Sequence, residues 1–100
     1  MRKGLELGLP EELVDFEAIA KETSRIRVRV EKRKFGRPVT VITGFDKSVD
    51  LKALAKKLKR RLACGGTVKE DSIELMGDHR RKVKDVLAEE GFPEDQILVE

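Results

Sequence analysis

The sequence is poor in the residue types on which most catalytic and metal sites depend. It has one cysteine, Cys64, and one histidine, His79. A single cysteine excludes an intrachain disulfide and a zinc site built from several cysteines. We expect no metal and no other cofactor. Cys64 near a helix end is typical of a small packed residue, and His79 in the first turn of a helix is typical of an exposed one. We therefore expect no enzyme activity.

Aromatic residues are equally scarce, because the sequence has no tryptophan and no tyrosine. Stacking of several single-stranded bases on an aromatic sheet is therefore not expected. Of the four phenylalanines, Phe16, Phe45 and Phe92 fit core positions. Phe35 is the exception, since it lies among cations. It either contacts a nucleotide or makes a local contact that shapes a turn.

Long apolar runs are missing as well. No stretch is long enough to span a membrane, so no membrane partner is expected. The N-terminus lacks the apolar core of a signal peptide, which favours the cytoplasm. Gly65-Gly66 is not a glycine-rich phosphate loop and is typical of a helix stop. With 39% hydrophobic and 41% charged residues among 100, the chain fits one small globular domain with a highly charged surface.

What the sequence does contain is a cationic centre between two acidic ends. The formal net charge of +3 conceals this asymmetry. Residues 1–24 carry −3 and residues 64–100 carry −5, whereas residues 25–45 carry +6 and residues 46–63 carry +5. If the central block folds onto one side, it forms the electrostatic footprint of a nucleic-acid-binding protein.

The stretch from Arg25 to Phe45 predicts a β-hairpin with a cationic tip. Apolar and basic residues alternate along its first arm, and β-favouring residues follow in the second. Gly36 can adopt positive φ, and Pro38 fixes φ where the return strand begins. The tip residues in between are Lys32, Arg33, Lys34, Phe35, Gly36 and Arg37. Clustered cations repel one another, so we interpret them as a contact for a polyanion; the alternative is a solvated turn.

The rest of the chain predicts two helices and three strands. Asp50 is a good N-cap for a helix whose apolar face runs from Leu51 to Leu62, and Gly65 and Gly66 end this helix. Strands are predicted at Thr67–Lys69 and Ser72–Met76, then a helix from His79 to Glu90 that Asp78 caps, and a last strand at 97–99. The predicted fold is α+β: an open two-layer α/β sandwich, β-β-α-β-β-α-β, with a mixed sheet and two helices on one face.

Residues 1–24 form a separate N-terminal segment in this interpretation. We expect it to be flexible, with a short helix near residues 11–22 that either docks on the core or stays mobile. Residues 25–100 then form the folded domain.

Three cationic elements favour a binding module. Besides the hairpin tip, they are the polar face of the first helix and the start of the second helix, whose N-terminus also offers backbone N–H groups to phosphate. The residues concerned are Lys52, Lys56, Lys59, Arg60, Arg80 and Arg81. A general RNA-binding or RNA-chaperone module, or a DNA-binding module, would use the same cations, and these alternatives stay open on composition alone.

Two segments resemble the translation initiation factor 1 family of archaea and eukaryotes. One is Thr40-Val41-Ile42-Thr43-Gly44-Phe45 at the end of the hairpin. The other runs from Lys57 to Val68 through Cys64-Gly65-Gly66-Thr67, and continues as Ile73-Glu74-Leu75-Met76-Gly77-Asp78-His79-Arg80. The resemblance covers residues 25–100, and the short hairpin turn looks more like the archaeal members.

The resemblance implies a monomeric factor that binds the small ribosomal subunit and its rRNA beside the P site. It implies that initiator tRNA, mRNA and other initiation factors lie nearby, and that the factor rejects wrong start codons. The family's basic loop matches the hairpin tip, and its second, tRNA-proximal loop matches Glu70 and Asp71, which are acidic here. Some archaeal members carry an N-terminal cysteine cluster for zinc, but the matching stretch from Gly4 to Phe16 has no cysteine.

Overall fold

The computed structural model describes residues 16–100 of the chain. The elements are α1 (Phe16–Thr23), β1 (Ile26–Lys32), η2 (Lys34–Gly36), β2 (Pro38–Thr43), α2 (Leu51–Leu62), β3 (Gly66–Lys69), β4 (Ser72–Met76), α3 (Arg80–Glu89), η3 (Glu94–Gln96) and β5 (Ile97–Val99). From β1 onward this is the expected β-β-α-β-β-α-β order, with two short 3-10 turns added.

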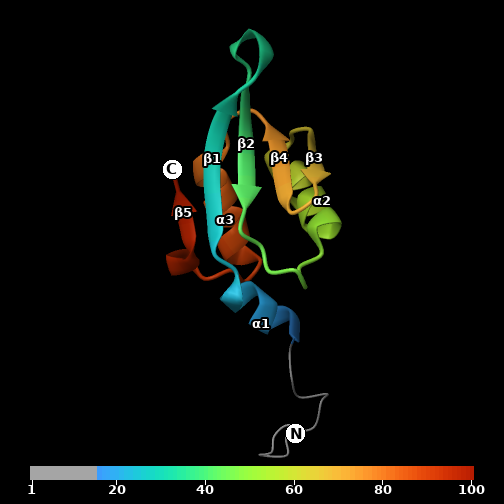
Figure 1. Ribbon diagram of the computed structural model, residues 1–100, viewed down its shortest axis with the longest axis vertical. Coiled ribbons are helices and arrows are strands. Elements are labelled where there is room, and N and C mark those ends of the chain that lie inside the picture. The colour runs from blue at the N-terminus through green and yellow to red at the C-terminus, as the bar shows by residue number, and fades with distance from the viewer. Residues whose placement is uncertain (1–15) are drawn as a thin grey trace, which may run out of the picture.

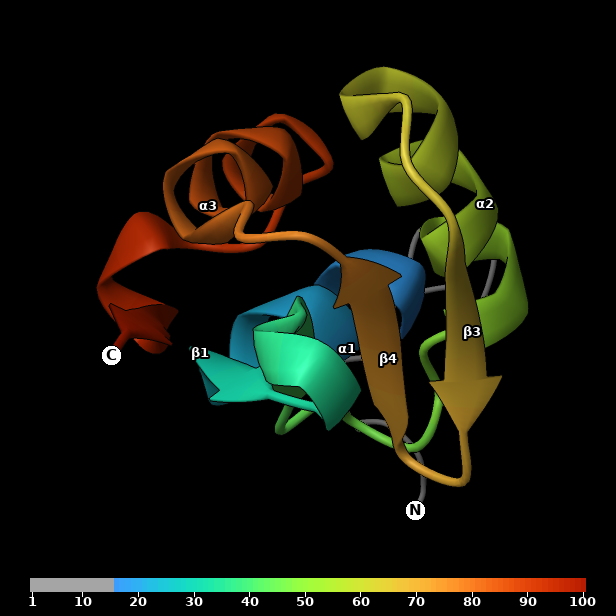
Figure 2. The same ribbon diagram turned by 90° about the horizontal axis from the view of Figure 1, so that it is seen from above.

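The strands form one mixed sheet in the order β3-β4-β2-β1-β5. β1 pairs in parallel with β5, and the other neighbouring strands are antiparallel. Viewed from above, α2 and α3 lie side by side on the same face of the sheet (Figure 2). The prediction of an α+β fold with two layers is confirmed.

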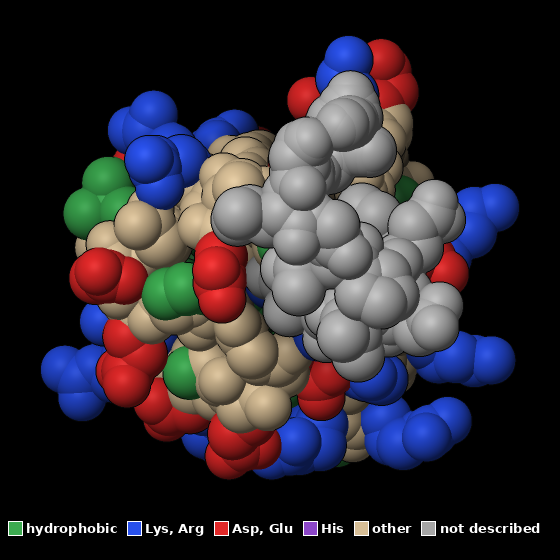
Figure 3. Space-filling model, turned by 90° about the horizontal axis from the view of Figure 1, so that it is seen from below, with side chains coloured by type: hydrophobic (Ala, Val, Ile, Leu, Met, Phe, Trp, Pro, Cys, Tyr) green, Lys and Arg blue, Asp and Glu red, His purple; other side chains and the backbone are tan. Residues whose placement is uncertain are grey.

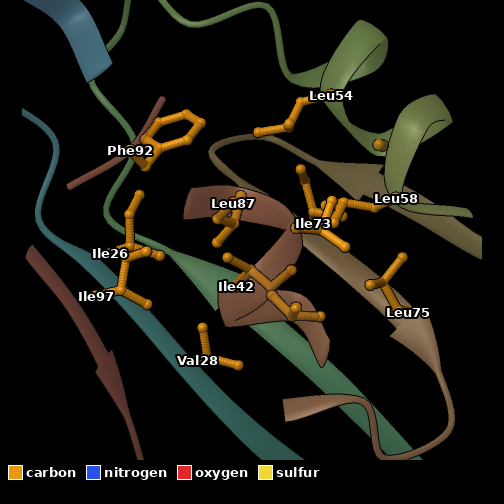
Figure 4. Packing of buried hydrophobic residues seen from close by; sticks show 13 residues of the cluster. Ile26, Val28, Ile42, Leu54, Leu58, Ile73, Leu75, Leu87, Phe92 and Ile97 are labelled. Carbon is orange, nitrogen blue, oxygen red and sulfur yellow. The ribbon is translucent and has the colours of Figure 1, made fainter. Parts of the chain in front are cut away.

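The core fills the space between these two helices and the sheet. Leu54 and Leu58 of α2 and Leu87 of α3 are buried against strand residues such as Ile42 and Ile73 (Figure 4). The apolar faces expected for both helices are therefore confirmed. Outside the sheet centre, the rings of Phe45 and Phe92 meet edge to face with centroids 5.7 Å apart, a favoured aromatic geometry.

The ends of α2 show one correct prediction and one wrong one. The Asp50 carboxylate accepts a hydrogen bond from the backbone N–H of Ala53 at 3.1 Å, as expected of an N-cap. The left-handed residue at the other end is Ala63, with φ 51°, and not a glycine. Gly66 instead begins β3, where a Cβ atom would lie 2.4 Å from the Glu74 carbonyl oxygen. This glycine is needed for strand packing rather than to end the helix.

α3 starts one residue later than expected and has a different N-cap. His79 occupies the N-cap position, and its side chain makes no capping hydrogen bond. The Asp78 carboxylate mainly binds the guanidinium of Arg80, at 2.9 Å and 3.0 Å. At the C-terminal end, Gly91 has φ +104° and the N–H of Phe92 bonds to the carbonyl of Leu87. This is the expected glycine stop.

α1 lies at the end of the molecule opposite the hairpin tip (Figure 1). The helix predicted near residues 11–22 is present over its described part, and residues 11–15 lie outside the described range. The Lys21 ammonium donates to the carbonyl of Glu90 and lies over the Phe92 ring, which joins α1 to the end of α3. Figure 3 views this end and shows acidic and basic side chains intermixed around the described surface.

Candidate nucleic-acid interface

The hairpin of β1 and β2 extends beyond the rest of the sheet. β1 pairs with β5 only from Ile26 to Val28, whereas its pairing with β2 continues to Lys32 and Pro38. The first strand is thus one residue longer than expected, since Lys32 was expected in the loop, whereas the return strand begins at Pro38 as expected. The far part of the ribbon has no third strand beside β1 and projects as the highest point in Figure 1.

A tight turn closes the ribbon. The N–H of Arg33 bonds to the carbonyl of Arg37 at 2.8 Å, and the N–H of Gly36 bonds to the carbonyl of Arg33 at 3.0 Å. Gly36 has the expected positive φ of 69°, and Phe35 before it also has a positive φ of 61°. Such a conformation is uncommon for a residue with a bulky side chain. The turn leaves Lys34, Phe35 and Arg37 exposed at the apex.

Arg33 differs from the other tip cations because acidic partners neutralise it. Its Nη2 lies 2.8 Å from a carboxylate oxygen of Glu31 and 3.2 Å from one of Glu74. Glu31 also binds Arg29 at 2.6 Å. Together, Arg29, Glu31, Arg33 and Glu74 form a tip-base ion-pair network. Their positions alternate with the buried residues of β1 and β4, so the network lies on the sheet face away from α2 and α3.

The network shifts the pKa values of its members. Hydrogen bonds from Arg29 and then Arg33 hold the pKa of Glu31 below its ordinary value. Hydrogen bonds to Glu74 and then Glu31 raise the pKa of the Arg33 guanidinium. Both shifts favour the ionised pair, so Glu31 and Arg33 carry opposite charges at neutral pH. Arg33 therefore differs from the other tip cations, because it must break its contacts with Glu31 and Glu74 before it can bind a phosphate.

The remaining tip cations are available to a ligand. Within residues 16–100, Lys32, Lys34 and Arg37 are exposed and form no ion pair with an acidic side chain. Cations on a narrow projecting ribbon repel one another and gain nothing from the fold. This geometry suits the insertion of the tip against a phosphate backbone.

A hollow of about 510 Å³ lies beside the tip. Its apolar part consists of Phe35, Val39 of β2 and Met76 of β4, and Lys34 and Arg37 are also at its wall. The other residues that line the hollow are Arg33, Gly66, Thr67 and Glu74. The hollow therefore combines an apolar surface with cations.

The basic face of α2 is exposed, as expected. Lys52, Lys56 and Arg60 are exposed and Lys59 is half-buried, and none of the four forms an ion pair within the described residues. Two cations outside the predicted set are engaged instead: Lys57 binds Glu90 and Arg61 binds Glu89. The face predicted from the sequence is thus the one left open to a partner.

The two predicted arginines of α3 differ in the same way. Arg80 is held by Asp78 and also donates to the backbone carbonyl of Glu100 at 2.9 Å. Arg81 is exposed and has no ion pair within residues 16–100. The start of α3 lies close to the base of the hairpin, because the Thr40 hydroxyl accepts from the N–H of His79 and donates to the carbonyl of Gly77.

The acidic turn of Glu70 and Asp71 does not share a surface with the tip. β2 runs from the tip towards Thr43, and β4 runs back beside it with Ile73 opposite Ile42 and Leu75 opposite Thr40. The turn before β4 therefore lies at the other end of the sheet, roughly one strand length, about 17 Å, from the base of the tip. The two loops face different surroundings on any partner.

The chemically reactive residues are engaged in the fold. Nε2 of His79 lies 2.7 Å from the carbonyl oxygen of Met76. Burial raises the pKa of the Cys64 thiol, the opposite of what a nucleophilic cysteine needs. In the described part of the chain, no cluster of three or more histidine, cysteine or acidic side chains is placed to hold a metal ion. No helix among these residues has the length and apolar character needed to cross a membrane.

The residues missed by the sequence interpretation are Glu31 and Glu74, the acidic partners of Arg33. A signal for one of them was present, because Glu31 follows Arg29 by two residues and so shares its face of a strand. Glu74 carried no such signal, since it is 41 residues from Arg33 in the chain.

Comparison with known proteins identifies the family of this chain. The family model described as Translation initiation factor SUI1 matches residues 22–93. A "Protein translation factor SUI1 homolog" of Methanocaldococcus jannaschii is 58% identical over 93 residues, covering 92% of this chain and 90% of that protein. The homolog of Hyperthermus butylicus is 53% identical, covering 92% and 88%, and that of Methanosarcina barkeri is 50% identical, covering 90% and 89%. The chain belongs to the SUI1 family of translation initiation factors, which are not enzymes.

Proposed function

We propose that this chain binds the small ribosomal subunit near the P site and promotes accurate start-codon selection by destabilising incorrect initiation complexes. The observation that carries the proposal is the projecting hairpin tip. Lys32, Lys34 and Arg37 are exposed there and have no acidic partner within the described residues. A family whose members act in translation initiation offers rRNA as the polyanion for these cations.

The open faces of the two helices extend this contact. Lys52, Lys56, Lys59 and Arg60 on α2 and Arg81 at the start of α3 are the further cations without an acidic partner among residues 16–100. The tip inserts against rRNA, and the helix cations bind phosphates around it. Neutralising several phosphates makes the affinity depend steeply on salt concentration.

Discrimination between codons then follows from a difference of free energies. Binding of the factor stabilises the open initiation complex, whereas a tRNA fully settled in the P site competes for the same space. Correct codon–anticodon pairing supplies enough free energy to displace the factor, and a mismatch does not. The acidic turn of Glu70 and Asp71 faces away from the tip, so it can approach the initiator tRNA while the tip holds rRNA. Its carboxylates repel tRNA phosphates.

The proposal includes the setting of this reaction. The factor acts as a monomer in the cytoplasm, next to initiator tRNA, mRNA and other initiation factors, and needs no cofactor. A reconstituted initiation assay tests it, with purified small subunits, labelled initiator tRNA and an mRNA carrying either AUG or a near-cognate codon.

The assay compares the parent chain with Lys34→Ala/Arg37→Ala and with Lys47→Ala, which removes an exposed cation far from the tip. We expect the parent and the Lys47 variant to speed the loss of tRNA from the near-cognate codon but not from AUG. The tip variant should lose this effect. An equal effect of the parent on both codons, or none on either, would show that the chain does not act on start-codon accuracy.

A further inference from the structure

The side chain of Phe35 is the most exposed large apolar group in the described part of the chain. It is 93% exposed, compared with 55% for Leu98 and 49% for Met76. The turn around it is closed by backbone hydrogen bonds, and its ring contributes nothing to the buried core. The alternative that this ring shapes the turn through a local contact is therefore not supported. A single exposed apolar side chain is common, but this ring shares the wall of a hollow with Val39 and Met76, and a grouped apolar surface points to a ligand.

The surroundings of the ring indicate which ligand fits. Phe35 is at the wall of the hollow of about 510 Å³, within the range of small-molecule sites. Val39 and Met76 provide further apolar surface, and Lys34 and Arg37 provide two positive charges. A ligand that complements this combination has a flat apolar group joined to negative charges. A nucleobase with its flanking phosphates has both.

The same combination argues against duplex RNA as the ligand at this position. In a duplex the faces of the bases are stacked inside the helix, and a double-stranded segment offers mainly phosphates and sugars. Phosphate alone would use Lys34 and Arg37 and leave the ring of Phe35 exposed to water. An unpaired base, in contrast, can stack on an aromatic side chain whatever its identity.

We propose that Phe35 stacks on an unstacked nucleobase of a looped or bulged RNA strand while Lys34 and Arg37 bind the adjacent phosphates. This inference rests on the proposed function, since it names the RNA structure that the tip binds on the ribosome. The tip thereby distinguishes unpaired from paired RNA without reading sequence. Stacking on one aromatic residue contributes enough for its loss to weaken binding about 5- to 150-fold.

The first test compares Phe35→Leu and Phe35→Trp with the parent in binding to purified small subunits. Leucine keeps an apolar side chain without a ring, and thermal melting shows whether each variant remains folded. We expect Phe35→Leu to bind about 5- to 150-fold more weakly with an unchanged salt dependence, because no phosphate contact is lost. Phe35→Trp should bind at least as tightly as the parent.

The second test uses tryptophan as a reporter, because the parent chain has none. The probes are an RNA hairpin with an unpaired loop and a fully paired RNA duplex of the same length. We expect the loop RNA to quench the fluorescence of Phe35→Trp strongly and the duplex to quench it little. Leu98→Trp, on the edge strand β5 away from the tip, is the control and should report no quenching.

The outcomes separate this inference from the proposed function. If Phe35→Leu binds subunits like the parent while Lys34→Ala/Arg37→Ala binds weakly, the tip contacts phosphates only and the stacking inference is wrong. Equal quenching by loop and duplex RNA would refute it too. If the folded parent does not bind small subunits at all, both the proposed function and the stacking inference fail.

Discussion

Three cations of the hairpin tip, Arg33, Lys34 and Arg37, should contribute unequally to RNA binding. Arg33 lies within 2.8 Å of Glu31 and 3.2 Å of Glu74, so its charge is already balanced inside the protein. Lys34 and Arg37 have no acidic partner among residues 16–100. The perturbation is therefore a set of single alanine variants at Arg33, Lys34 and Arg37, together with the Lys34→Ala/Arg37→Ala double variant.

The expected magnitude is a change in the salt dependence of binding. The slope of log affinity against log salt concentration falls by about 0.7–0.9 for each phosphate contact that is lost. The double variant should lower the slope by about 1.4–1.8, since it removes two contacts. Arg33→Ala should leave the slope unchanged within error. The substitution removes one positive charge, but that charge is shared between two carboxylates of the protein, so no phosphate contact is lost.

Equilibrium binding to purified small subunits at four or more potassium chloride concentrations measures these slopes. Lys47→Ala serves as the matched control, because it removes an exposed cation from the loop after β2. Melting curves confirm that each variant is folded. If Arg33→Ala lowers the slope as much as Lys34→Ala does, the ion-pair network does not occupy Arg33 on the ribosome. The assignment of the free cations would then be wrong.

Four further predictions concern stability. Leu58→Ala, at a fully buried position of α2, should lower the free energy of unfolding by about 2–5 kcal/mol in a denaturant titration; a change near zero would contradict the core assignment. Gly44→Ala should cost at least about 4 kcal/mol, because its Cβ would lie 1.7 Å from the Arg25 carbonyl oxygen. Gly36→Ala, with open space around a Cβ, should cost only about 1–2 kcal/mol for its positive φ. The melting temperature should decrease when the pH is lowered below about 4. The pKa of Glu31 is lowered in the folded chain, so its carboxylate takes up a proton more readily in the unfolded chain than in the folded chain. Glu31→Gln should reduce that fall, and an unchanged pH profile in this variant would exclude the carboxylate as a cause.

The hairpin could be predicted from the sequence because its determinants are local. Alternation of Ile26, Val28 and Val30 with arginines fixes which residues face the core, and Gly36 allows a turn with positive φ. The tip cations were visible for the same reason, since a run of basic residues needs no knowledge of the fold. Their exposure follows from their position at the end of a ribbon.

The ends of the helices were harder to predict because several residues compete for one role. Gly65, Gly66 and Ala63 all lie near the end of α2, and glycine normally takes the left-handed position. The close approach of the Glu74 carbonyl to Gly66 depends on the pairing of β3 with β4. This long-range requirement cannot be deduced from the helix sequence, so the left-handed residue was assigned to the wrong position.

The division of the tip cations into paired and free ones was also beyond the sequence. It depends on the contact between Arg33 and Glu74, two residues that only the sheet order β4-β2-β1 brings together. The same order places Met76 and Val39 beside Phe35 at the hollow. From the sequence we interpreted the tip as a contact for a polyanion, with a solvated turn as the alternative, and the fold indicates which of its side chains are available.

Cosedimentation with purified small ribosomal subunits tests most directly whether the hairpin tip carries ribosome binding. The parent chain is compared at physiological salt with Lys34→Ala/Arg37→Ala and with Lys52→Ala/Lys56→Ala, which removes the same number of charges from the exposed face of α2. We predict that the parent sediments with the subunits, that the α2 variant is weakened moderately, and that the tip variant stays in the supernatant although it is folded. A folded tip variant that sediments like the parent would contradict the account and shift the ribosomal contact to α2.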